Sequence, residues 1–350
     1  MPSEEGPMGE LLADHTTLRF GGPADLWLSH TDSASWSETI RALEGRRPFI
    51  LGGGSNTLAD DTGYPGAVVR MANPGITARS VGDGQVELTV QSGEPLGRLV
   101  VYAVTEGLSG VEYLGGIPGT TGAAPVQNTG AYGQQIADCL TSVTAWDWAL
   151  GRMVRLDPAT CRFRYRSSVF KTHPGRWAIL AITLRLSRSD RAAPVSYGHL
   201  AHALDLPLGS RPPLHEAAAG VLADREARGL SLPESGPDAR QAGSVFLNPP
   251  VDRAQASMVR ATGGRVYRDG DGMLRASAGW LLEQSGYSPG VHVGPGVYCS
   301  ANRALTVTAR DDATGSSFLT CLHRMARTVR ETSGIELRPE PVRPPAEVRT

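Results

Sequence analysis

The sequence predicts an α+β fold made of two or three packed lobes. The chain has 350 residues, of which 40% are hydrophobic, and this is more than one ordinary domain needs. Short apolar segments with strand character alternate with a few segments in which apolar residues recur at helical spacing, and no internal repeat is found. A sizeable hydrophobic core is therefore expected.

The first lobe, which we place at residues 1–72, is predicted to be a small α/β unit. Residues 25–28 have extended character, and residues 33–43 carry apolar side chains at helical spacing behind Asp and Ser caps. Two short apolar strands are predicted at residues 48–51 and 66–71. The first of these strands runs directly into a glycine-rich loop.

The second lobe, placed at residues 73–205, is predicted to be α+β. A strand at 86–90 leads into a helix at 96–106, which Gly107 ends. Strand character then dominates, in segments 142–148, 152–156 and 177–186. We therefore expect the main sheet of the protein in this lobe.

The third lobe is placed at residues 210–334. A Pro-rich linker at 207–213 precedes a predicted helix at 215–228. A stripe of apolar residues at 318–329 predicts a second helix, and residues 335–337 are predicted to form a terminal strand.

Charge and cysteine content exclude several classes of protein. The formal net charge is −1 and there is no long basic run, so we expect neither nucleic acid nor a membrane surface as a partner. The N-terminus has no apolar signal segment, and no run approaches the roughly 18 apolar residues of a membrane span, so we expect a cytoplasmic protein. The four cysteines lie far apart without CxxC spacing, which predicts reduced thiols and no metal site.

A first glycine-rich loop, GGGSN at residues 52–56, follows a predicted strand. Glycine backbone allows successive N–H groups to converge on an anion such as a pyrophosphate. The loop matches neither GxGxxG nor GxxxxGK[ST], so neither the Rossmann nor the P-loop interpretation is supported. A plain tight turn remains the alternative for this loop taken alone.

A second stretch of small residues extends over residues 116–133. Small residues permit the close approach of a flat, bulky ligand, Gln127 and Asn128 can hydrogen-bond with a heterocycle, and Tyr132 can cover it. The alternative is a glycine-rich turn in a packed core. The presence of both features favours a ligand site.

Several motifs occur in order along nearly the whole chain. They read TTLRFGGPA at 16–24, LGGGSN at 51–56, GLSGVEYLGGIPGTTGAAPVQNTGAYG at 107–133, FRYRSSVFK at 163–171, AGSVFLNP at 242–249, SAGWLLEQSG at 277–286 and LRPE at 337–340. In this order they resemble the UDP-N-acetylenolpyruvoylglucosamine reductases, also called UDP-N-acetylmuramate dehydrogenases. Six or more ordered motifs are far more specific than any single one.

The resemblance implies a two-lobed FAD-binding fold of the PCMH/vanillyl-alcohol-oxidase type and a C-terminal α/β substrate-binding domain. FAD is expected between the first two lobes, and the C-terminal strand at 335–350 is expected to return to the FAD-binding part. The cofactor-binding residues that the resemblance implies are Gly52, Gly53, Gly54, Ser55, Asn56, Gly119, Gly122, Ala123, Gln127, Asn128, Gly130, Ala131, Tyr132, Gly133 and Tyr165.

Three residues match the family's catalytic positions. Arg166 matches the arginine that binds the substrate carboxylate, and its planar fork and charge suit both the carboxylate and a developing enolate. Glu340 matches the glutamate that assists as the carboxylate takes enol character, and Ser244 matches the serine that delivers a proton. Outside these motifs, such an arginine or glutamate is usually a surface residue, and such a serine usually caps a turn or helix. The implied substrate-binding residues are Tyr197, Asn248 and Gln284.

The implied reaction is the reduction of UDP-N-acetyl-3-O-(1-carboxyvinyl)-glucosamine to UDP-N-acetylmuramate in peptidoglycan precursor synthesis. FAD would be bound and NADPH would be the cosubstrate of a monomeric enzyme. NADPH and the UDP-sugar would use the same pocket in turn, so ping-pong kinetics are expected. No metal takes part in this scheme.

Three positions depart from the family pattern. Ser231 and Leu247 stand where relatives carry basic residues, and Arg303 stands where they carry histidine. Because Lys171 is the only lysine, arginines would have to replace the missing charge; those nearby are Arg225, Arg228 and Arg240. These departures leave open a diverged paralogue acting on a related nucleotide-sugar. Two further alternatives are a flavin oxidase that shares this FAD-binding architecture and a flavoprotein that binds ligand without turnover.

Overall fold

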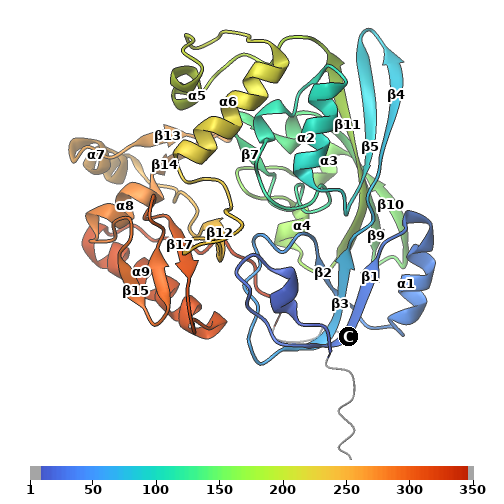
Figure 1. The fold of residues 1–350 in the computed structure, drawn as a ribbon, viewed down its shortest axis with the longest axis horizontal. Helices are drawn as coiled ribbons and strands as arrows, with labels where there is room; N and C mark the ends of the chain where they lie inside the picture. Colours follow the sequence, from blue (N-terminus) through green and yellow to red (C-terminus); the bar gives the residue numbers. More distant parts are fainter. Residues whose placement is uncertain (1–8, 346–350) are drawn as a thin grey trace, which may run out of the picture. The chain divides into compact units, whose positions relative to one another are not determined.

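The computed structural model describes residues 9–345, which form two compact units (Figure 1). Unit 1 consists of the chain up to Trp27, of Gly54–Ala67 and of the chain from Leu232 onward. Unit 2 consists of Leu28–Gly53 and Val68–Ser231. Each unit has its own hydrophobic core.

The centre of unit 2 is an antiparallel sheet in the order β10-β9-β11-β5-β4, with β6 also paired to β11. Its strands are β4 (Ile76–Gly82), β5 (Gln85–Gln91), β6 (Leu108–Ser109), β9 (Leu140–Asp147), β10 (Arg152–Leu156) and β11 (Trp177–Arg188). Helix α2 (Leu96–Thr105) packs Leu96, Leu99 and Ala103 into a core shared with β5 and β11. These apolar residues lie on one helical face, which is why the segment covers the sheet (Figure 1).

A second cluster of unit 2 forms around two helices, α5 (Gly198–Ala203) and α6 (Leu214–Ala227). Leu214, Ala217 and Val221 of α6 recur at spacings of three and four residues, so they share one face and pack together. Tyr113 and Tyr132 belong to the same cluster. The cluster therefore packs α6 against the end of the second glycine-rich loop.

Three short strands form a separate sheet in the order β1-β3-β2. They are β1 (Ala24–His30), β2 (Phe49–Leu51) and β3 (Tyr64–Met71), and β2 runs parallel to β3. Helix α1 (Trp36–Ala42) follows a 3₁₀ turn (Ser33–Ser35), where Asp32 accepts a hydrogen bond from the backbone N–H of Ala34. The strand, helix and two further strands predicted for residues 25–71 are confirmed.

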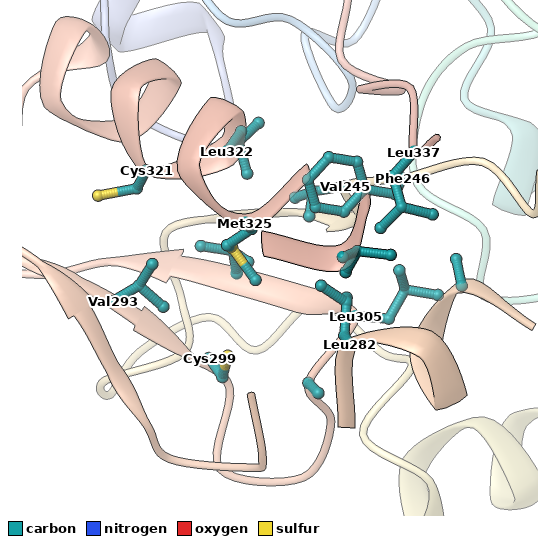
Figure 2. Close-up of a cluster of buried hydrophobic side chains, with 14 of the residues drawn as sticks. Val245, Phe246, Leu282, Val293, Cys299, Leu305, Cys321, Leu322, Met325 and Leu337 are labelled. Atoms are coloured by element: carbon teal, nitrogen blue, oxygen red, sulfur yellow. The ribbon is translucent and has the colours of Figure 1, made fainter. Parts of the chain in front are cut away.

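The sheet of unit 1 has four strands in the order β12-β17-β16-β15. Their bounds are β12 (Gln241–Ser244), β15 (His292–Gly294), β16 (Val297–Cys299) and β17 (Thr306–Ala309). Helices α8 (Ala278–Gln284) and α9 (Gly315–Ser333) contribute to the same core. Figure 2 shows Cys321, Leu322 and Met325 of α9 beside the strands that carry Val293 and Cys299.

Short elements complete the two units. They are η1 (Leu12–His15), η3 (Glu112–Leu114), β7 (Gly130–Ala131), β8 (Gln134–Gln135), η4 (Ile136–Asp138), α3 (Pro158–Cys161), α4 (Val169–Thr172), α7 (Arg253–Ala261), β13 (Val266–Arg268) and β14 (Leu274–Ala276). Helix α9 ends at Gly334, whose φ of 67° is left-handed, as predicted from the sequence. Among residues 9–345, no helix is long and apolar enough to cross a membrane.

The segment after α9 differs from the prediction of a strand at 335–337. Residues 335–337 form no strand, and the segment that follows has only isolated bridges, from Pro339 to Phe246 and from Val342 to Thr57. Proline lacks a backbone N–H, so Pro339 and its near neighbour Pro341 interrupt any continuous ladder. Residues 346–350 of the predicted returning strand, and residues 1–8 of the first lobe, lie outside the described residues.

Candidate functional site

The two glycine-rich loops meet within unit 2. A Cβ added to Gly53 would lie 3.0 Å from the Cα of Gly119, and one added to Gly52 would lie 3.1 Å from the Cβ of Ala123. A larger residue at position 53 would press on the backbone of Gly119, and one at position 52 on the side chains of Thr120 and Ala123, which explains why glycine occupies both positions. The loop after β2 therefore packs directly on the stretch Gly119–Ala123.

A buried hydroxyl lies at this junction. Thr120 is only 8% exposed, and within the described part of the chain its Oγ1 has no hydrogen-bond partner. The Oγ1 atom is 2.8 Å from the place where a Cβ of Gly52 would stand. An unpaired buried hydroxyl is costly, and between two loops rich in backbone N–H groups it fits a ligand oxygen such as that of a pyrophosphate. The residues present thus suit a dinucleotide cofactor.

The second loop is anchored to the connection between β5 and α2. The backbone N–H of Leu96 donates to the carbonyl of Gly119 at 3.0 Å, and the N–H of Gly122 donates to the carbonyl of Ser92 at 3.0 Å. The hydroxyl of Thr121 donates to the carbonyl of Gln91 at 2.6 Å. These bonds tie the irregular loop to the main sheet, so its position is set by regular structure.

Asn128 holds the far end of this loop. Its φ is 47°, and its side-chain Nδ2 donates to Gln135 Oε1 at 2.8 Å and to the carbonyl of Arg164 at 3.3 Å. Its Oδ1 accepts a hydrogen bond from the N–H of Ala137 at 3.2 Å. The neighbouring Gln127 is half-buried. The Asn128 side chain therefore joins the loop to the turn that carries Arg166.

Arg166 lies at the tip of a tight turn in unit 2. The turn is closed by two backbone hydrogen bonds between Arg164 and Ser167, and the φ of Arg166 is 51°. Such a left-handed conformation is unfavourable for arginine and marks a position that the surrounding structure holds in place. Strain of this kind is concentrated at functional sites.

The guanidinium of Arg166 is held by the second glycine-rich loop. Its Nη2 donates to the carbonyl of Gly130 at 2.8 Å, its Nη1 donates to the carbonyl of Asn128 at 3.4 Å, and it lies 5.7 Å from the centre of the Tyr165 ring. The ammonium of Lys171 donates to the carbonyl of Arg166 at 3.1 Å. The only lysine of the chain thus supports the turn that bears this arginine.

In unit 1, three segments that are far apart in sequence converge around Glu340. The backbone N–H of Glu340 donates to the carbonyl of Val245, next to Ser244, at 2.8 Å. The carbonyl of Glu340 accepts a hydrogen bond from Asn56 Nδ2 at 3.2 Å. The first glycine-rich loop, the strand that bears Ser244 and the C-terminal segment therefore meet at one place.

Ser244 is the last residue of β12 and follows an irregularity in the strand. The pairing with β17 passes from Gln241↔Thr308 to Ser244↔Thr306, so β12 has one more residue than its partner over this interval. Gly243 has φ of 69°, a conformation that glycine adopts without strain. A bulge of this kind turns the following side chain, here that of Ser244, away from the regular alternation.

Asn248 and Gln284 lie at opposite ends of α8. Asn248 Oδ1 accepts a hydrogen bond from the N–H of Ala278 at 2.9 Å, so its side chain caps the start of this helix. Its backbone carbonyl accepts from Arg275 Nη1 at 3.0 Å. Gln284 is the last residue of α8 and is exposed. The structure therefore does not bring these two predicted substrate-binding residues together.

Tyr197 contacts Tyr132, and a carboxylate that the sequence did not point to lies behind them. The two rings meet edge to face, with centroids 6.1 Å apart. Tyr132 Oη donates to Asp224 Oδ2 at 2.7 Å, and Arg228 Nη1 donates to the same oxygen at 3.0 Å. The only signal in the sequence was the spacing of Asp224 and Arg228, which are four residues apart on a predicted helix.

A cavity of about 380 Å³ in unit 2 borders Tyr132. Tyr132 and Ser196 contribute to its wall, together with Gln134 and Cys139. Burial, followed by the nearby charge of Asp138, raises the pKa of the Cys139 thiol to about 12, so the thiol remains protonated. Tyr132, Ser196, Gln134 and Cys139 thus give the cavity neutral polar groups, to which Asp138 and Arg185 add charge.

The three arginines that could replace the missing lysine charge already bind chain acceptors. Arg225 is 8% exposed and its Nη2 donates to the carbonyl of Leu230 at 2.7 Å, while Arg228 binds Asp224. Arg240 donates to backbone carbonyls that include that of Leu18 at 3.2 Å. Because a guanidinium has five N–H donors, these bonds restrict the orientation of each side chain but leave donors over for a phosphate, among them the Nε of Arg225, which has no partner among the described residues.

Two family profiles match the chain. One is described as the FAD binding domain and matches residues 31–157. The other is described as the UDP-N-acetylenolpyruvoylglucosamine reductase C-terminal domain and matches residues 236–343. The predicted FAD-binding fold and the separate C-terminal domain are therefore confirmed, and FAD is the cofactor of this fold.

Curated relatives and a solved structure match over nearly the full length. The UDP-N-acetylenolpyruvoylglucosamine reductase of Salinispora arenicola is 38% identical over 95% of this chain and 93% of its own length. The protein of the same name from Saccharopolyspora erythraea is 39% identical over 95% of this chain and 94% of its own length. The crystal structure of UDP-N-acetylenolpyruvylglucosamine reductase from Thermus caldophilus has 26% sequence identity and a TM-score of 0.66, and the match covers 96% of this chain and 98% of that one. Since this identity extends over almost the whole sequence and the fold agrees, the chain belongs to the UDP-N-acetylenolpyruvoylglucosamine reductases, a family of FAD-dependent oxidoreductases.

Proposed function

We propose that this protein reduces UDP-N-acetyl-3-O-(1-carboxyvinyl)-glucosamine to UDP-N-acetylmuramate with electrons from NADPH, in peptidoglycan precursor synthesis. The observation that carries the proposal is the convergence in unit 1, where the backbone of Glu340 is bonded to Val245, beside Ser244, and to Asn56 of the first glycine-rich loop. Membership of the reductase family supports it.

Arg166 is proposed to bind the carboxylate of the substrate. A guanidinium can form two parallel hydrogen bonds with a carboxylate, and its charge stabilises the negative charge that develops when the adjacent vinyl group is reduced. The carbonyls of Asn128 and Gly130 hold the guanidinium before the substrate arrives. Little reorganisation is then needed when charge develops.

Ser244 and Glu340 complete the proposed chemistry. The hydroxyl of Ser244 gives its proton to the carbon next to the carboxylate, and Glu340 assists as that carboxylate takes enol character. A serine hydroxyl has too high a pKa to act alone, so it depends on a polarised environment. When bound, FAD would transfer a hydride from NADPH to the terminal carbon of the vinyl group.

The cofactor and substrate are assigned to parts of the chain as follows. Residues 1–72 and 73–205 would hold FAD through Gly52–Asn56, the stretch 116–133 and Tyr165, and residues 210–334 would bind the UDP-sugar. The support is that the FAD-binding match falls at 31–157 and the C-terminal-domain match at 236–343. Tyr197, Asn248 and Gln284 are proposed substrate contacts. We assign the protein to the cytoplasm as a monomer.

A two-step anaerobic experiment tests the proposed reaction. The purified protein should release FAD on denaturation, NADPH should bleach the bound flavin, and the enolpyruvyl UDP-sugar should then restore its absorbance. Mass spectrometry should find a product heavier than the substrate by two hydrogens. Flavin bleaching without reoxidation by the UDP-sugar would overturn the proposal, as would turnover that requires oxygen.

The departures at Ser231 and Leu247 favour one second candidate, a paralogue that reduces a related unsaturated nucleotide-sugar. The support is that Arg225, Arg228 and Arg240 already bind acceptors of the chain. Comparing kcat/KM for the enolpyruvyl UDP-sugar with that for analogues altered in the sugar or nucleotide distinguishes the two. A higher value for an analogue would favour the paralogue.

A further inference from the structure

A buried carboxylate on α6 fixes the orientation of Tyr132. Asp224 is 7% exposed, and its Oδ2 accepts the hydroxyl proton of Tyr132 at 2.7 Å and a proton of Arg228 Nη1 at 3.0 Å. The two hydrogen bonds offset much of the free energy needed to remove the carboxylate from water, and the bond to Tyr132 is charge-assisted. The ring of Tyr132 is therefore tied to α6 at its hydroxyl end.

The backbone of Tyr132 is constrained as well. Its φ is 51°, and its carbonyl accepts a hydrogen bond from the hydroxyl of Ser196 at 3.4 Å. Burial, with the Asp224 hydrogen bond and charge as further causes, raises the pKa of the Tyr132 phenol above its ordinary value. The phenol thus remains a donor throughout the physiological range, and its bond to Asp224 does not break through its own ionisation.

Tyr197 rests on the ring that is held in this way. Its centroid is 6.1 Å from that of Tyr132, with 73° between the ring planes, while 48% of its surface is exposed. Tyr197 directly precedes α5, and its carbonyl accepts the N–H of Ala201. Within unit 2, these contacts thus connect Asp224 through Tyr132 to Tyr197.

We infer that Asp224 is a positioning residue for substrate recognition: it holds Tyr132, and through it the exposed Tyr197, in place for the nucleotide-sugar. The inference rests on the proposed function, because Tyr197 is a substrate contact only within that proposal. Asp224 touches neither substrate nor cofactor in this scheme. Its substitution should therefore weaken UDP-sugar binding more than it slows the reaction of bound substrate.

The chain contains a matched control for this arrangement. Asp147, at the end of β9, has a side chain only 3% exposed, and its Oδ2 accepts hydrogen bonds from Trp177 Nε1 at 2.8 Å and from Arg176 Nη2 at 3.3 Å. It is thus another buried aspartate shared between an aromatic donor and an arginine. Neither donor is in contact with Tyr197. Any effect of Asp147→Asn on KM or on hydrogen exchange therefore measures what weakening a buried aspartate of this kind does in general.

The experiment compares Asp224→Asn, Asp224→Ala and Asp147→Asn in the holoenzyme. The KM for the enolpyruvyl UDP-sugar should rise about fivefold in Asp224→Asn, where the acceptor of the phenol loses its charge, and about tenfold or more in Asp224→Ala, where the acceptor is lost. The rate of flavin bleaching at saturating NADPH should change by a smaller factor than this KM, because Asp224 supports Tyr197 and contacts none of the residues proposed to react. Asp147→Asn should leave the KM unchanged.

A readout that does not depend on activity separates this inference from the proposed function. Hydrogen exchange of the peptide that spans 195–204 should accelerate in Asp224→Ala but not in Asp147→Asn, because only the former loses the support of Tyr197. If wild-type protein fails to reduce the UDP-sugar but this exchange difference is found, the proposed function fails while the positioning contact stands. Equal exchange in the two variants, or a change in kcat without a change in KM, would overturn the inference.

The double variant Asp224→Ala/Tyr132→Phe provides a final check. If Asp224 acts through the hydroxyl of Tyr132, the KM of the double variant should be no higher than that of Asp224→Ala. In Asp224→Ala the hydroxyl has already lost its acceptor, so removing it adds nothing. Additive increases in KM would show that Asp224 acts by another route. Asp224→Asn, which keeps an acceptor oxygen for the phenol, keeps the comparison interpretable if Asp224→Ala fails to fold.

Discussion

Arg166 in unit 2 is held through its side chain as well as its backbone turn, whereas the bonds described for Glu340 in unit 1 are those of its backbone, and Ser244 is placed by the strand that carries it. The guanidinium donates to the carbonyls of Asn128 and Gly130. The backbone N–H of Glu340 donates to Val245, and Ser244 is paired with Thr306. A charged group that must receive a carboxylate gains from fixed orientation, whereas a proton donor needs a fixed position and a hydroxyl that can rotate. Substitutions in the two regions should therefore have different consequences.

The largest effect is expected from Ser244→Ala. Removal of the proton donor should slow flavin reoxidation by the enolpyruvyl UDP-sugar about 1000-fold, within the range for general acids. The affinity for FAD should not change, because the pairing of β12 with β17 uses the backbone. Stopped-flow absorbance measures the first quantity and flavin titration of the apoprotein the second.

The control for this variant is Ser316→Ala, which replaces an exposed serine in the first turn of α9 in the same unit. It should leave both quantities unchanged. A loss of FAD affinity in Ser244→Ala as large as its loss of rate would mean that the serine supports the fold of the region and does not supply the proton.

Arg166→Met is expected to have the next largest effect and to act on two steps. Loss of the charge should slow reoxidation about 100-fold, as for the removal of one preorganised donor. Loss of the bonds to Asn128 and Gly130 should also loosen the second glycine-rich loop and weaken FAD binding. Reoxidation kinetics and FAD titration together measure this double effect, which separates Arg166 from Ser244.

Arg164→Met serves as the control because Arg164 belongs to the same turn but its side chain is exposed. It should preserve FAD affinity and rate. If Arg166→Met binds FAD as tightly as the wild type, the contrast between the two regions is wrong, and the guanidinium does not support the loop.

The sequence predicted those parts of the site whose residue types are dictated by local geometry. Glycine at positions 52, 53 and 119 signals close backbone approach, and the structure shows that contact directly. Gly334 was recognised as the end of α9 for the same kind of reason. Such positions can be inferred because few other residues satisfy the required geometry.

The contacts that tertiary structure creates were beyond sequence reasoning. Asp224 looks like any acidic residue of an exposed helix until α6 packs beside Tyr132. The sequence singles out Lys171 as the only lysine but does not indicate that its ammonium binds the carbonyl of Arg166. The predicted strand at 335–337 is wrong, since the segment after α9 has only isolated bridges, at Pro339 and Val342.

Gly53→Ala tests the junction of the two glycine-rich loops. The new Cβ would lie 3.0 Å from the Cα of Gly119, so one backbone must shift by a few tenths of an ångström. Overpacking of this kind costs about 1–2 kcal/mol, which should weaken FAD binding roughly tenfold in a flavin titration. Gly97→Ala in α2, where the added Cβ meets nothing within 4 Å, should leave FAD binding unchanged. Equal FAD affinities in the two variants would mean that the contact between the loops does not shape the cofactor site.

The smallest effect is expected from Lys171→Met, which tests how far the backbone of Arg166 depends on the lysine. Loss of the hydrogen bond to the carbonyl of Arg166 removes about 1 kcal/mol of support from a turn whose φ is already left-handed. Reoxidation by the UDP-sugar should slow about fivefold, and Lys171→Arg should restore most of the rate because it retains a charged donor. The slowing should disappear in an Arg166→Met background, since both residues act through the same guanidinium. If Lys171→Met slows the Arg166→Met enzyme by the same factor, the lysine acts independently of the turn, and the placement of Arg166 depends on its own side-chain bonds alone.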